Sequence, residues 1–484
     1  MIGASGMVSQ LGIATRSHAQ RERLALPWFL FVTADVLVAF LAFGIATALV
    51  FAAVAWTSES GMLPQRINII LTERLAHFSV FVPVLVFWFT QLGHYRRGVP
   101  FWTEVQQVCW VIVVVALADG FSQYVSHQLY SRSWLVLSWV LVAFLLVTGR
   151  RALKSALLRA GVWQLPTVVV GSGETIDEAV AALGSERHLG YEVVARIDLG
   201  AQTPVPAAAD LLSTRDPRFV VIAAEATDVP RVQSLIADLH RKGAAFAVVP
   251  PLSGMSVLNM SAQGFFSHDA VLLTAPNNLQ RLHARILKRC FDLAVSAILL
   301  VALSPLFGVL ALMIRRDGGP ALFGQRRVGR GGRRITCLKF RTMVADADRR
   351  LAALLARDPA AREEWARDQK LRNDPRVTPV GRFLRRTSLD ELPQLINVLR
   401  GEMSLVGPRP IVPDEVPRFG EDIVYYYEVD PGITGLWQVS GRNGLDYARR
   451  VQLNSWYVRN WSLWHDVTIL FRTVRVVLER DGAY

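Results

Sequence analysis

The sequence predicts a membrane protein of mixed architecture. We expect a four-helix transmembrane block, a Rossmann-like α/β domain and a final α/β domain with a re-entrant membrane helix-break-helix. Three observations predict it. The 484 residues are 52% apolar, with a mean hydropathy of +0.29, and the apolar residues are concentrated in blocks. A β-branched run meets a glycine turn in mid-chain, and Ser304 and Pro305 interrupt the last apolar block.

The early apolar blocks predict a transmembrane unit over residues 27–150, behind a cytoplasmic segment of residues 1–26. The first block is too long for a signal-peptide core, and no small-residue cleavage site follows it, so we expect a retained helix. The first and fourth blocks are long enough to span a bilayer, and the other two are near the lower limit. The four blocks are residues 27–56, 76–93, 107–121 and 134–148.

Basic residues flank these blocks unevenly. Because cytoplasmic loops of membrane proteins are rich in Arg and Lys, the pattern places both ends of the block in the cytoplasm. The inner flanks contain Arg16, Arg21, Arg23, Arg96, Arg97, Arg150, Arg151, Lys154 and Arg159, and the outer loops contain Arg66, Arg74 and Arg132.

The net charge of +13 first suggests anionic lipid head groups as partners. No basic patch is interleaved with aromatic residues, so we do not expect nucleic acid. The three cysteines are scattered, without a CxxC spacing, which argues against disulfides and against a zinc site.

Residues 164–275 show the alternating strand and helix patterns of a Rossmann-like α/β domain. Its first strand leads into Gly171 and Gly173, but Ile176 stands where the third glycine of a dinucleotide-binding GxGxxG motif would fall. A lone GxG after a strand is often a tight turn. The sequence therefore favours a turn over a bound dinucleotide and leaves any ligand of this domain open.

The apolar stretch of residues 291–314 is long enough to cross a membrane, yet basic pairs flank both of its ends. Pro305 removes a backbone donor in its middle, and Ser304 is placed to satisfy the freed carbonyl groups or to cap the start of a new helix. A fifth crossing would also put everything after Arg315 outside the cell, away from cytosolic nucleotides. We therefore favour a helix that enters the membrane and returns over a proline-kinked crossing helix.

Adjacent carboxylates, Asp390 and Glu391, follow a cluster of arginines that includes Arg385. Ser388 and Glu391 match a capping box, and Pro393 indicates that a helix begins close by. Two acids at a helix start are common, but the same position suits a nucleophile or a magnesium ligand. The surrounding cations favour phosphate handling over a solvated surface.

Further cations occur in two other motifs. Lys339 and Arg341 follow an alternating run that predicts a strand, and Arg409 lies in a rigid Gly-Pro-Arg-Pro loop. We expect all three to bind phosphate or substrate. The basic, glycine-rich turn of residues 329–332 suits lipid head groups or plain solvent, and residues 431–443 are typical of a binding loop. With no Ser-His-Asp order and no metal-binding His pair, these residues suit phosphoryl transfer with a divalent ion.

These motifs resemble the bacterial sugar transferase family, the monotopic phosphoglycosyl transferases. They are most similar to the large members that prime exopolysaccharide synthesis, the undecaprenyl-phosphate glucose or galactose phosphotransferases. The likeness covers residues 281–484, which would form the catalytic domain. Its ordered motifs are KRCFD, the Ser-Pro break, GQRRVG, KFRTM, SLDELPQL, GEMSLVGPRP and PGITGLWQVSGRN.

The resemblance implies a two-step reaction. Asp390 would attack the β-phosphorus of a UDP-sugar, release UMP and hold the sugar phosphate as an aspartyl phosphosugar. Undecaprenyl phosphate would then accept the hexose 1-phosphate, with glucose 1-phosphate expected and galactose 1-phosphate the alternative. Glu391 would help to bind Mg²⁺, Arg385 would bind phosphate, and Arg409 would bind the nucleotide sugar or the phosphosugar.

The resemblance also implies a multi-pass protein of the bacterial inner membrane, with its catalytic domain in the cytoplasm and membrane lipids around it. Ser304 and Pro305 would form the break of the re-entrant helix. A homodimer is left open. So are two other functions: a non-catalytic membrane scaffold that binds a nucleotide, and a glycosyltransferase that releases UDP instead of UMP.

Overall fold

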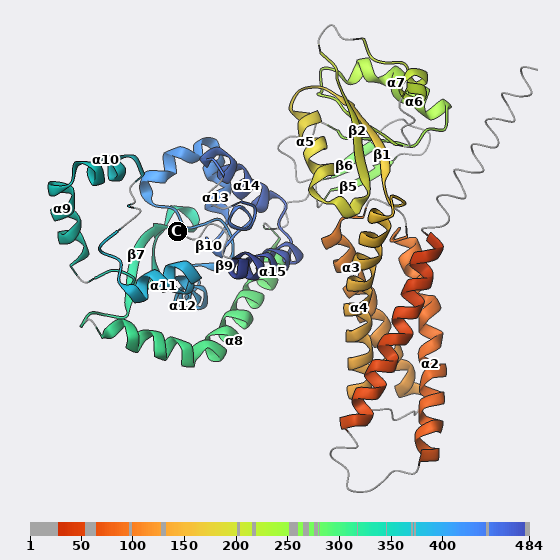
Figure 1. Cartoon of the computed structure of the whole chain (residues 1–484), viewed down its shortest axis with the longest axis horizontal. Coiled ribbons are helices and arrows are strands. Elements are labelled where there is room, and N and C mark those ends of the chain that lie inside the picture. Colours follow the sequence, from red (N-terminus) through yellow and green to blue (C-terminus); the bar gives the residue numbers. More distant parts are fainter. Residues whose placement is uncertain are drawn as a thin grey trace, which may run out of the picture. The chain divides into compact units, whose positions relative to one another are not determined.

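The computed structural model has two compact units, Met1–Pro251 and Leu252–Tyr484, which are shown in Figure 1 and described separately below. The predicted N-terminal segment, residues 1–26, lies outside the described residues, as do Arg96 and Arg97. The structure describes residues 28–53, 64–95, 99–126, 132–200, 204–214, 219–250, 260–264, 271–274, 279, 281–316, 318–344, 346–368, 371, 374–441 and 445–479.

Four long helices form the first part of unit one, as Figure 1 shows. Each is long and apolar enough to cross a membrane. Aromatic rings pack between them: the Phe78 ring centroid lies 4.9 Å from that of Phe43 and 5.0 Å from that of Trp139. Large apolar side chains also face outward, and this fits a membrane protein. The helices are Trp28–Ala53, α2 (Pro64–Gln91), α3 (Phe101–Val125) and α4 (Arg132–Arg159).

Buried ion pairs tie these helices together, and the sequence patterns did not predict them. Arg74, which the charge pattern counted as a loop residue, lies in α2 with its side chain fully buried and 3.1 Å from Asp119 of α3. Arg150 and Lys154 are likewise buried in α4. Lys154 Nζ lies 2.6 Å from Glu104 Oε2. Part of the basic flank that predicted the orientation is therefore neutralised within the helix block.

The second part of unit one confirms a parallel sheet with the strand order β2-β1-β3-β4. Three buried valines of β1 lie at its centre, between helices on the two faces. An antiparallel pair, β5 (Ser261–Gly264) and β6 (Val271–Thr274), follows in the chain. The elements are β1 (Leu165–Gly171), α5 (Gly173–Ser185), η1 (Arg187–Leu189), β2 (Tyr191–Asp198), α6 (Ala208–Thr214), β3 (Phe219–Ala223), α7 (Val229–Arg241) and β4 (Phe246–Val248).

Unit two contains α8 (Leu282–Arg315) and a small α/β fold. Unit two also includes the β5–β6 pair, and its other sheets are the antiparallel pair β7–β8 and the parallel pair β9–β10. The elements after α8 are β7 (Leu322–Val328), η3 (Arg330–Gly332), β8 (Arg334–Phe340), α9 (Ala347–Arg357), α10 (Pro359–Asp368), α11 (Pro379–Thr387), η4 (Leu389–Glu391), α12 (Gln394–Arg400), β9 (Ser404–Val406), η5 (Pro413–Asp422), α13 (Ile423–Glu428), β10 (Gly432–Thr434), η6 (Trp437–Val439), α14 (Tyr447–Arg459) and α15 (Leu463–Glu479).

Helix α8 is bent, and Figure 1 shows its two halves running in different directions. Pro305 has no N–H for the carbonyl group of Val301, four residues earlier. The hydroxyl group of Ser304 donates to that carbonyl oxygen at 2.8 Å, as expected from the sequence. The side chain of Val301 is 75% exposed, so the bend is an apolar surface without a protein covering.

Both ends of α8 are fastened to the same α/β fold. At the N-terminal end, Lys288 Nζ lies 2.7 Å from Asp466 Oδ2 and donates to the carbonyl oxygen of Val406 at 3.1 Å. At the C-terminal end, the carbonyl oxygen of Ile314 accepts a hydrogen bond from the guanidinium group of Arg341 at 3.1 Å. The two ends of this apolar helix therefore meet one globular fold.

Candidate active site

Asp390 and Glu391 lie in the 3-10 turn η4, between α11 and α12. At the start of α11, the Thr378 hydroxyl accepts the N–H of Gly381 at 2.9 Å. Ser388 ends the same helix in the left-handed conformation, with φ of 55°. The expected capping box is wrong, because Ser388 closes the preceding helix and its side chain makes no capping hydrogen bond to η4, which follows it. Pro393 does precede α12, as predicted.

Glu391 is held by two cations. Lys339 Nζ, at the end of β8, lies 2.7 Å from Glu391 Oε1, and a guanidinium nitrogen of Arg409 lies 3.7 Å from the same oxygen. Burial would raise the pKa of Glu391, but Arg409 and Lys339 outweigh it and hold that pKa below its ordinary value. Glu391 is therefore an ionised carboxylate at neutral pH.

Asp390 has the opposite shift. Burial raises the pKa of its carboxyl group, and the charge of Glu391 raises it further, while Lys339 and Arg385 act in the other direction. Two neighbouring carboxylates with pKa values pushed apart are typical of sites where they have different roles.

The predicted arginines lie in two different places. Arg385 Nε donates to the Thr342 hydroxyl at 3.0 Å, and its charge acts on Asp390. Arg341 donates to three backbone carbonyl oxygens at the end of α8 and in the adjoining loops, including that of Pro320 at 2.7 Å. Its side chain thus anchors α8, and its expected part in phosphate binding stays a prediction.

Arg409 lies in a loop fixed by close backbone packing. Gly407 donates its N–H to the Thr434 carbonyl oxygen at 2.9 Å, and Gly432 donates to that of Pro408 at 2.8 Å. A Cβ atom on Gly432 would lie 2.1 Å from the backbone nitrogen of Gly407, so neither glycine leaves room for a side chain. The packing of the parallel strands β9 and β10 therefore fixes the position of the Arg409 backbone.

Lys339, Glu391 and Arg409 meet at a pocket whose lining includes Arg327 and Cys337, which were not proposed as site residues from the sequence, whereas Asp390, Arg341 and Arg385 do not line it. Burial raises the pKa of the Cys337 thiol to about 11, so it is neutral at pH 7. Alternation along the β7–β8 hairpin would have found both, because Arg327, Cys337 and Lys339 lie on one face of the paired strands. The pocket is lined by Arg327, Cys337, Lys339, Glu391, Gln394, Arg409, Pro410, Gly432 and Ile433.

The other predicted segments have mixed positions. Residues 431–441 of the expected binding loop include β10 and η6, and Gly432 and Ile433 line the pocket, but Arg442 and Asn443 lie outside the described residues. The glycine-rich turn forms η3, where Arg330 is exposed.

The chemistry of the donors fits Mg²⁺. Within the described residues, no group of three or more His, Cys, Asp or Glu side chains is gathered as a metal site. Mg²⁺ commonly binds one or two carboxylates and takes its remaining ligands from substrate phosphates and water. Glu391 and Asp390 could supply such carboxylates.

The fold and the site define an enzyme class with paired carboxylates and convergent cations next to an apolar helix. Residues 283–480 match the bacterial sugar transferase family, and residues 90–235 match a CoA-binding domain. The chain is 42% identical to an undecaprenyl-phosphate galactose phosphotransferase of Salmonella typhimurium, over 85% of this chain and 89% of that protein. It belongs to the bacterial sugar transferase family, and the expected enzyme class, a phosphoglycosyl transferase, is confirmed.

Other relatives match a smaller share of this chain. An exopolysaccharide production protein, ExoY of Sinorhizobium fredii, is 50% identical over 41% of this chain and 88% of its own length. An undecaprenyl-phosphate glucose phosphotransferase of Komagataeibacter xylinus is 46% identical over 39% of this chain and 35% of its own length. The relatives and the apolar helices fit a bacterial membrane protein.

The match to a CoA-binding domain raises the question of whether the Rossmann-like fold suits a phosphate-bearing cofactor. Such cofactors place phosphate at the glycine turn that starts the first helix. Here the Glu225 carboxylate lies at that turn: it accepts the N–H of Glu174 at 3.2 Å, and a Cβ atom on Gly173 would lie 1.6 Å from its Oε1 atom. An acidic side chain in this position does not fit coenzyme A.

Proposed function

We propose that the protein transfers a hexose 1-phosphate from a UDP-sugar to undecaprenyl phosphate through a covalent aspartyl phosphosugar, with release of UMP. This would be the first step of exopolysaccharide synthesis. The observation that supports it best is that the pKa values of two adjacent carboxylates are shifted in opposite directions. Lys339 and Arg409 keep Glu391 ionised, while the pKa of Asp390 beside it is raised. The relatives' names support galactose and glucose equally.

In the first step, an oxygen of Asp390 forms a bond to the β-phosphorus of the donor. The bond from this phosphorus to the bridging oxygen breaks, and UMP leaves with the electron pair. In the second step, a phosphate oxygen of undecaprenyl phosphate attacks the same phosphorus and releases the Asp390 carboxylate. In both steps negative charge accumulates around the phosphorus that is transferred, and preorganised cations stabilise this charge.

The cations around the pocket are placed to balance that charge. Lys339, Arg327 and Arg409 line it, and Arg385 acts on Asp390 from the neighbouring helix. Mg²⁺, when bound, would neutralise the diphosphate and stabilise the leaving phosphate. Burial keeps the Asp390 carboxylate poorly hydrated, which favours its reaction with phosphorus once it is ionised.

We also propose that α8 enters the cytoplasmic leaflet of the inner membrane and returns. Both of its ends contact one globular fold, through Lys288 and Ile314, while the apolar bend around Val301 is exposed. A straight crossing would place these two contacts on opposite sides of the bilayer. A re-entrant helix instead keeps the site beside the lipid phosphate and the cytosolic nucleotide sugar.

The test uses purified full-length protein with undecaprenyl phosphate, Mg²⁺ and UDP-glucose or UDP-galactose labelled at the β-phosphorus. We expect UMP release and covalent labelling of the protein when the acceptor is omitted, and neither with Asp390→Asn. Asp414→Asn, which changes an exposed aspartate outside the pocket, is the matched control. Release of UDP, or labelling that survives Asp390→Asn, would contradict the mechanism. The donor that labels the protein identifies the sugar.

A further inference from the structure

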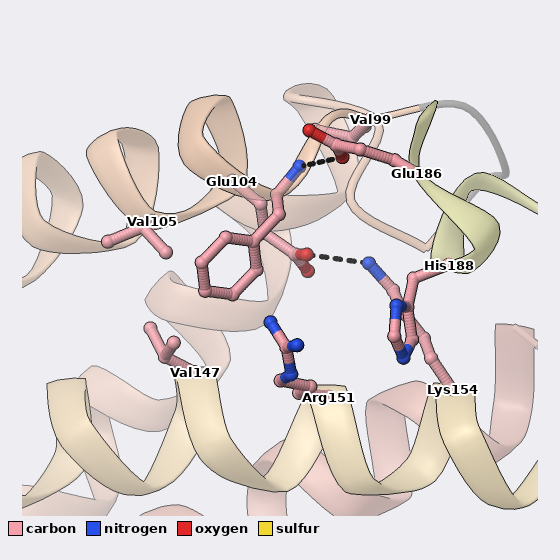
Figure 2. Close-up of a pocket in the computed structure, with 9 residues that line it drawn as sticks. Val99, Glu104, Val105, Val147, Arg151, Lys154, Glu186 and His188 are labelled. Carbon is pink, nitrogen blue, oxygen red and sulfur yellow. Dashed lines mark hydrogen bonds and ion pairs between the residues drawn. The ribbon is translucent and has the colours of Figure 1, made fainter. Parts of the chain in front are cut away.

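A second pocket lies in unit one, where the helix block meets the Rossmann-like fold. It is formed by residues before and at the start of α3, the second half of α4, and η1 with the residue before it. The reaction proposed above does not use it. It is lined by Val99, Phe101, Glu104, Val105, Val147, Arg151, Lys154, Glu186 and His188, most of which are labelled in Figure 2.

The pocket has an apolar side and a polar side. In Figure 2, Val105 and Val147 lie to one side of the Arg151 guanidinium group, and His188 lies to the other. Val147 and Arg151 are four residues apart and therefore share one face of α4. Along this face, the apolar run of α4 gives way to basic residues, which is the composition change found where a helix leaves the hydrocarbon and enters the head-group layer.

The negative charges of the pocket are already compensated. Glu104 Oε2 lies 2.6 Å from Lys154 Nζ, and Glu104 Oε1 lies 3.4 Å from a guanidinium nitrogen of Arg150. The Glu186 carboxylate accepts the backbone N–H of Phe101 at 2.9 Å, at the positive end of the α3 dipole. An added anion would therefore meet no uncompensated carboxylate among the lining residues.

Arg151 is the cation of this pocket that is oriented by an aromatic ring. Its guanidinium carbon lies 5.0 Å from the ring centroid of Phe101. The side chain is exposed, and within the described residues no ion pair to Arg151 occurs. On the polar side, burial and the charges of Arg151 and Lys154 lower the pKa of His188, so a neutral imidazole ring faces the pocket.

We propose that this pocket binds the phosphodiester group of a membrane glycerophospholipid. The guanidinium group of Arg151 contacts the phosphate, and the first methylene groups of an acyl chain lie against Val105 and Val147. Arginine suits phosphate because its planar donors match the phosphate oxygens, and a location at the head-group layer supplies the lipid at high local concentration. A lipid held here joins α3, α4 and η1 across the junction between the helix block and the Rossmann-like fold.

The experiment is native mass spectrometry of full-length protein extracted with its lipids, comparing Arg151→Gln with Arg159→Gln. Arg159 is an exposed arginine eight residues further along α4 and lines no part of the pocket. We expect the fraction of protein with bound phospholipid to fall by about tenfold in Arg151→Gln and to be unchanged in Arg159→Gln. Equal retention by the two variants would overturn the proposal.

A second arm distinguishes lipid from free phosphate. Delipidated protein is heated with phosphatidylglycerol, with phosphatidylethanolamine or with inorganic phosphate, and we expect only the phospholipids to raise the melting temperature. Stabilisation by inorganic phosphate alone would show an ion site and contradict the lipid assignment. Arg151→Lys keeps the charge without the planar donors and should show intermediate retention. UMP release by each variant reports that the rest of the chain is folded.

Discussion

Lys339 and Glu391 form a 2.7 Å ion pair that connects the end of β8 to the turn containing Asp390. The pair makes Lys339 a neighbour of both carboxylates, because its charge also lowers the pKa of Asp390 against the effect of burial. One lysine therefore influences the ionisation of the two groups that the proposed reaction needs.

We expect Lys339→Met to reduce the rate of UMP release by roughly 10- to 100-fold, since a hydrogen bond to a charged group contributes about 1.5–3 kcal/mol. The variant leaves Glu391 without its nearest cation and removes positive charge near the donor phosphates. Steady-state kinetics with the labelled donor measure the effect, with Lys242→Met, an exposed lysine of unit one, as the control. An unchanged kcat/KM would show that Lys339 affects neither Glu391 nor the donor phosphates during the reaction.

The pH dependence of the first step should report the raised pKa of Asp390. Single-turnover UMP release should increase with pH along an acid limb whose midpoint lies above about 3.9, the ordinary aspartate value. Glu391→Gln removes a negative charge that disfavours ionised Asp390, so the pKa of Asp390 falls and the limb moves to lower pH, although the rate is also reduced. A limb that stays in place or moves upward in this variant would contradict the coupling.

The direction of α8 can be tested by labelling. In a chain whose native cysteines are replaced, we expect Arg281→Cys and Arg316→Cys both to react with a membrane-impermeant maleimide in inside-out vesicles. The two positions flank α8, and a re-entrant helix leaves both in the cytoplasm. If only the cysteine at position 281 reacts, the helix crosses the membrane.

Coenzyme A should not bind the wild-type protein at concentrations up to about 1 mM, because Glu225 occupies the turn where its phosphate would lie. Glu225→Gln removes the charge, and any affinity gained should be specific to this change. Glu178→Gln, at an exposed position on α5, is the control. Equilibrium dialysis measures binding. Binding of coenzyme A by the wild-type protein would contradict the prediction, and an equal affinity in Glu225→Gln would mean that the cofactor binds elsewhere.

Asp466→Asn should destabilise unit two by about 3–5 kcal/mol, the usual cost of removing one partner from a buried ion pair. Asp466 has almost no exposed surface and accepts hydrogen bonds from Lys288 and Tyr457, both at 2.7 Å. Thermal unfolding in detergent measures the change. Asp422→Asn, at the last residue of η5 and in no ion pair within the described residues, should have little effect, and equal losses in the two variants would argue against a special role for the ion pair of Lys288 and Asp466.

The sequence predicted the parts of this fold that depend on local pattern. Apolar blocks gave the helices, a β-branched run gave β1, and the Pro305 break came with the hydroxyl group of Ser304 already in place to satisfy Val301. Three of the residues chosen from the motifs do lie together, because Lys339 and Arg409 are within ion-pair distance of Glu391, and their expected part in substrate binding stays a prediction.

What the sequence missed depends on contacts between distant residues. Arg341 belongs to a motif rich in cations, yet its guanidinium group donates hydrogen bonds to backbone carbonyl groups at and just after the end of α8. Ser388 has the spacing of a capping box, but the preceding helix ends on it in the left-handed conformation. The buried pair of Arg74 and Asp119 is 45 residues apart and left no local signal.

The fastening of α8 has a consequence for biosynthesis. Lys288 leaves the ribosome 178 residues before Asp466, its buried partner, so while most of unit two is still being made its nearby carboxylate is that of Asp292, which lies four residues further along α8 and 3.9 Å away in the folded protein. The apolar helix thus emerges long before the fold that holds its two ends together. In the re-entrant arrangement that we propose, the nascent chain must keep α8 from inserting as an ordinary fifth span until translation is nearly finished, and the Pro305 bend and the basic pairs that flank the apolar stretch are already present at that stage.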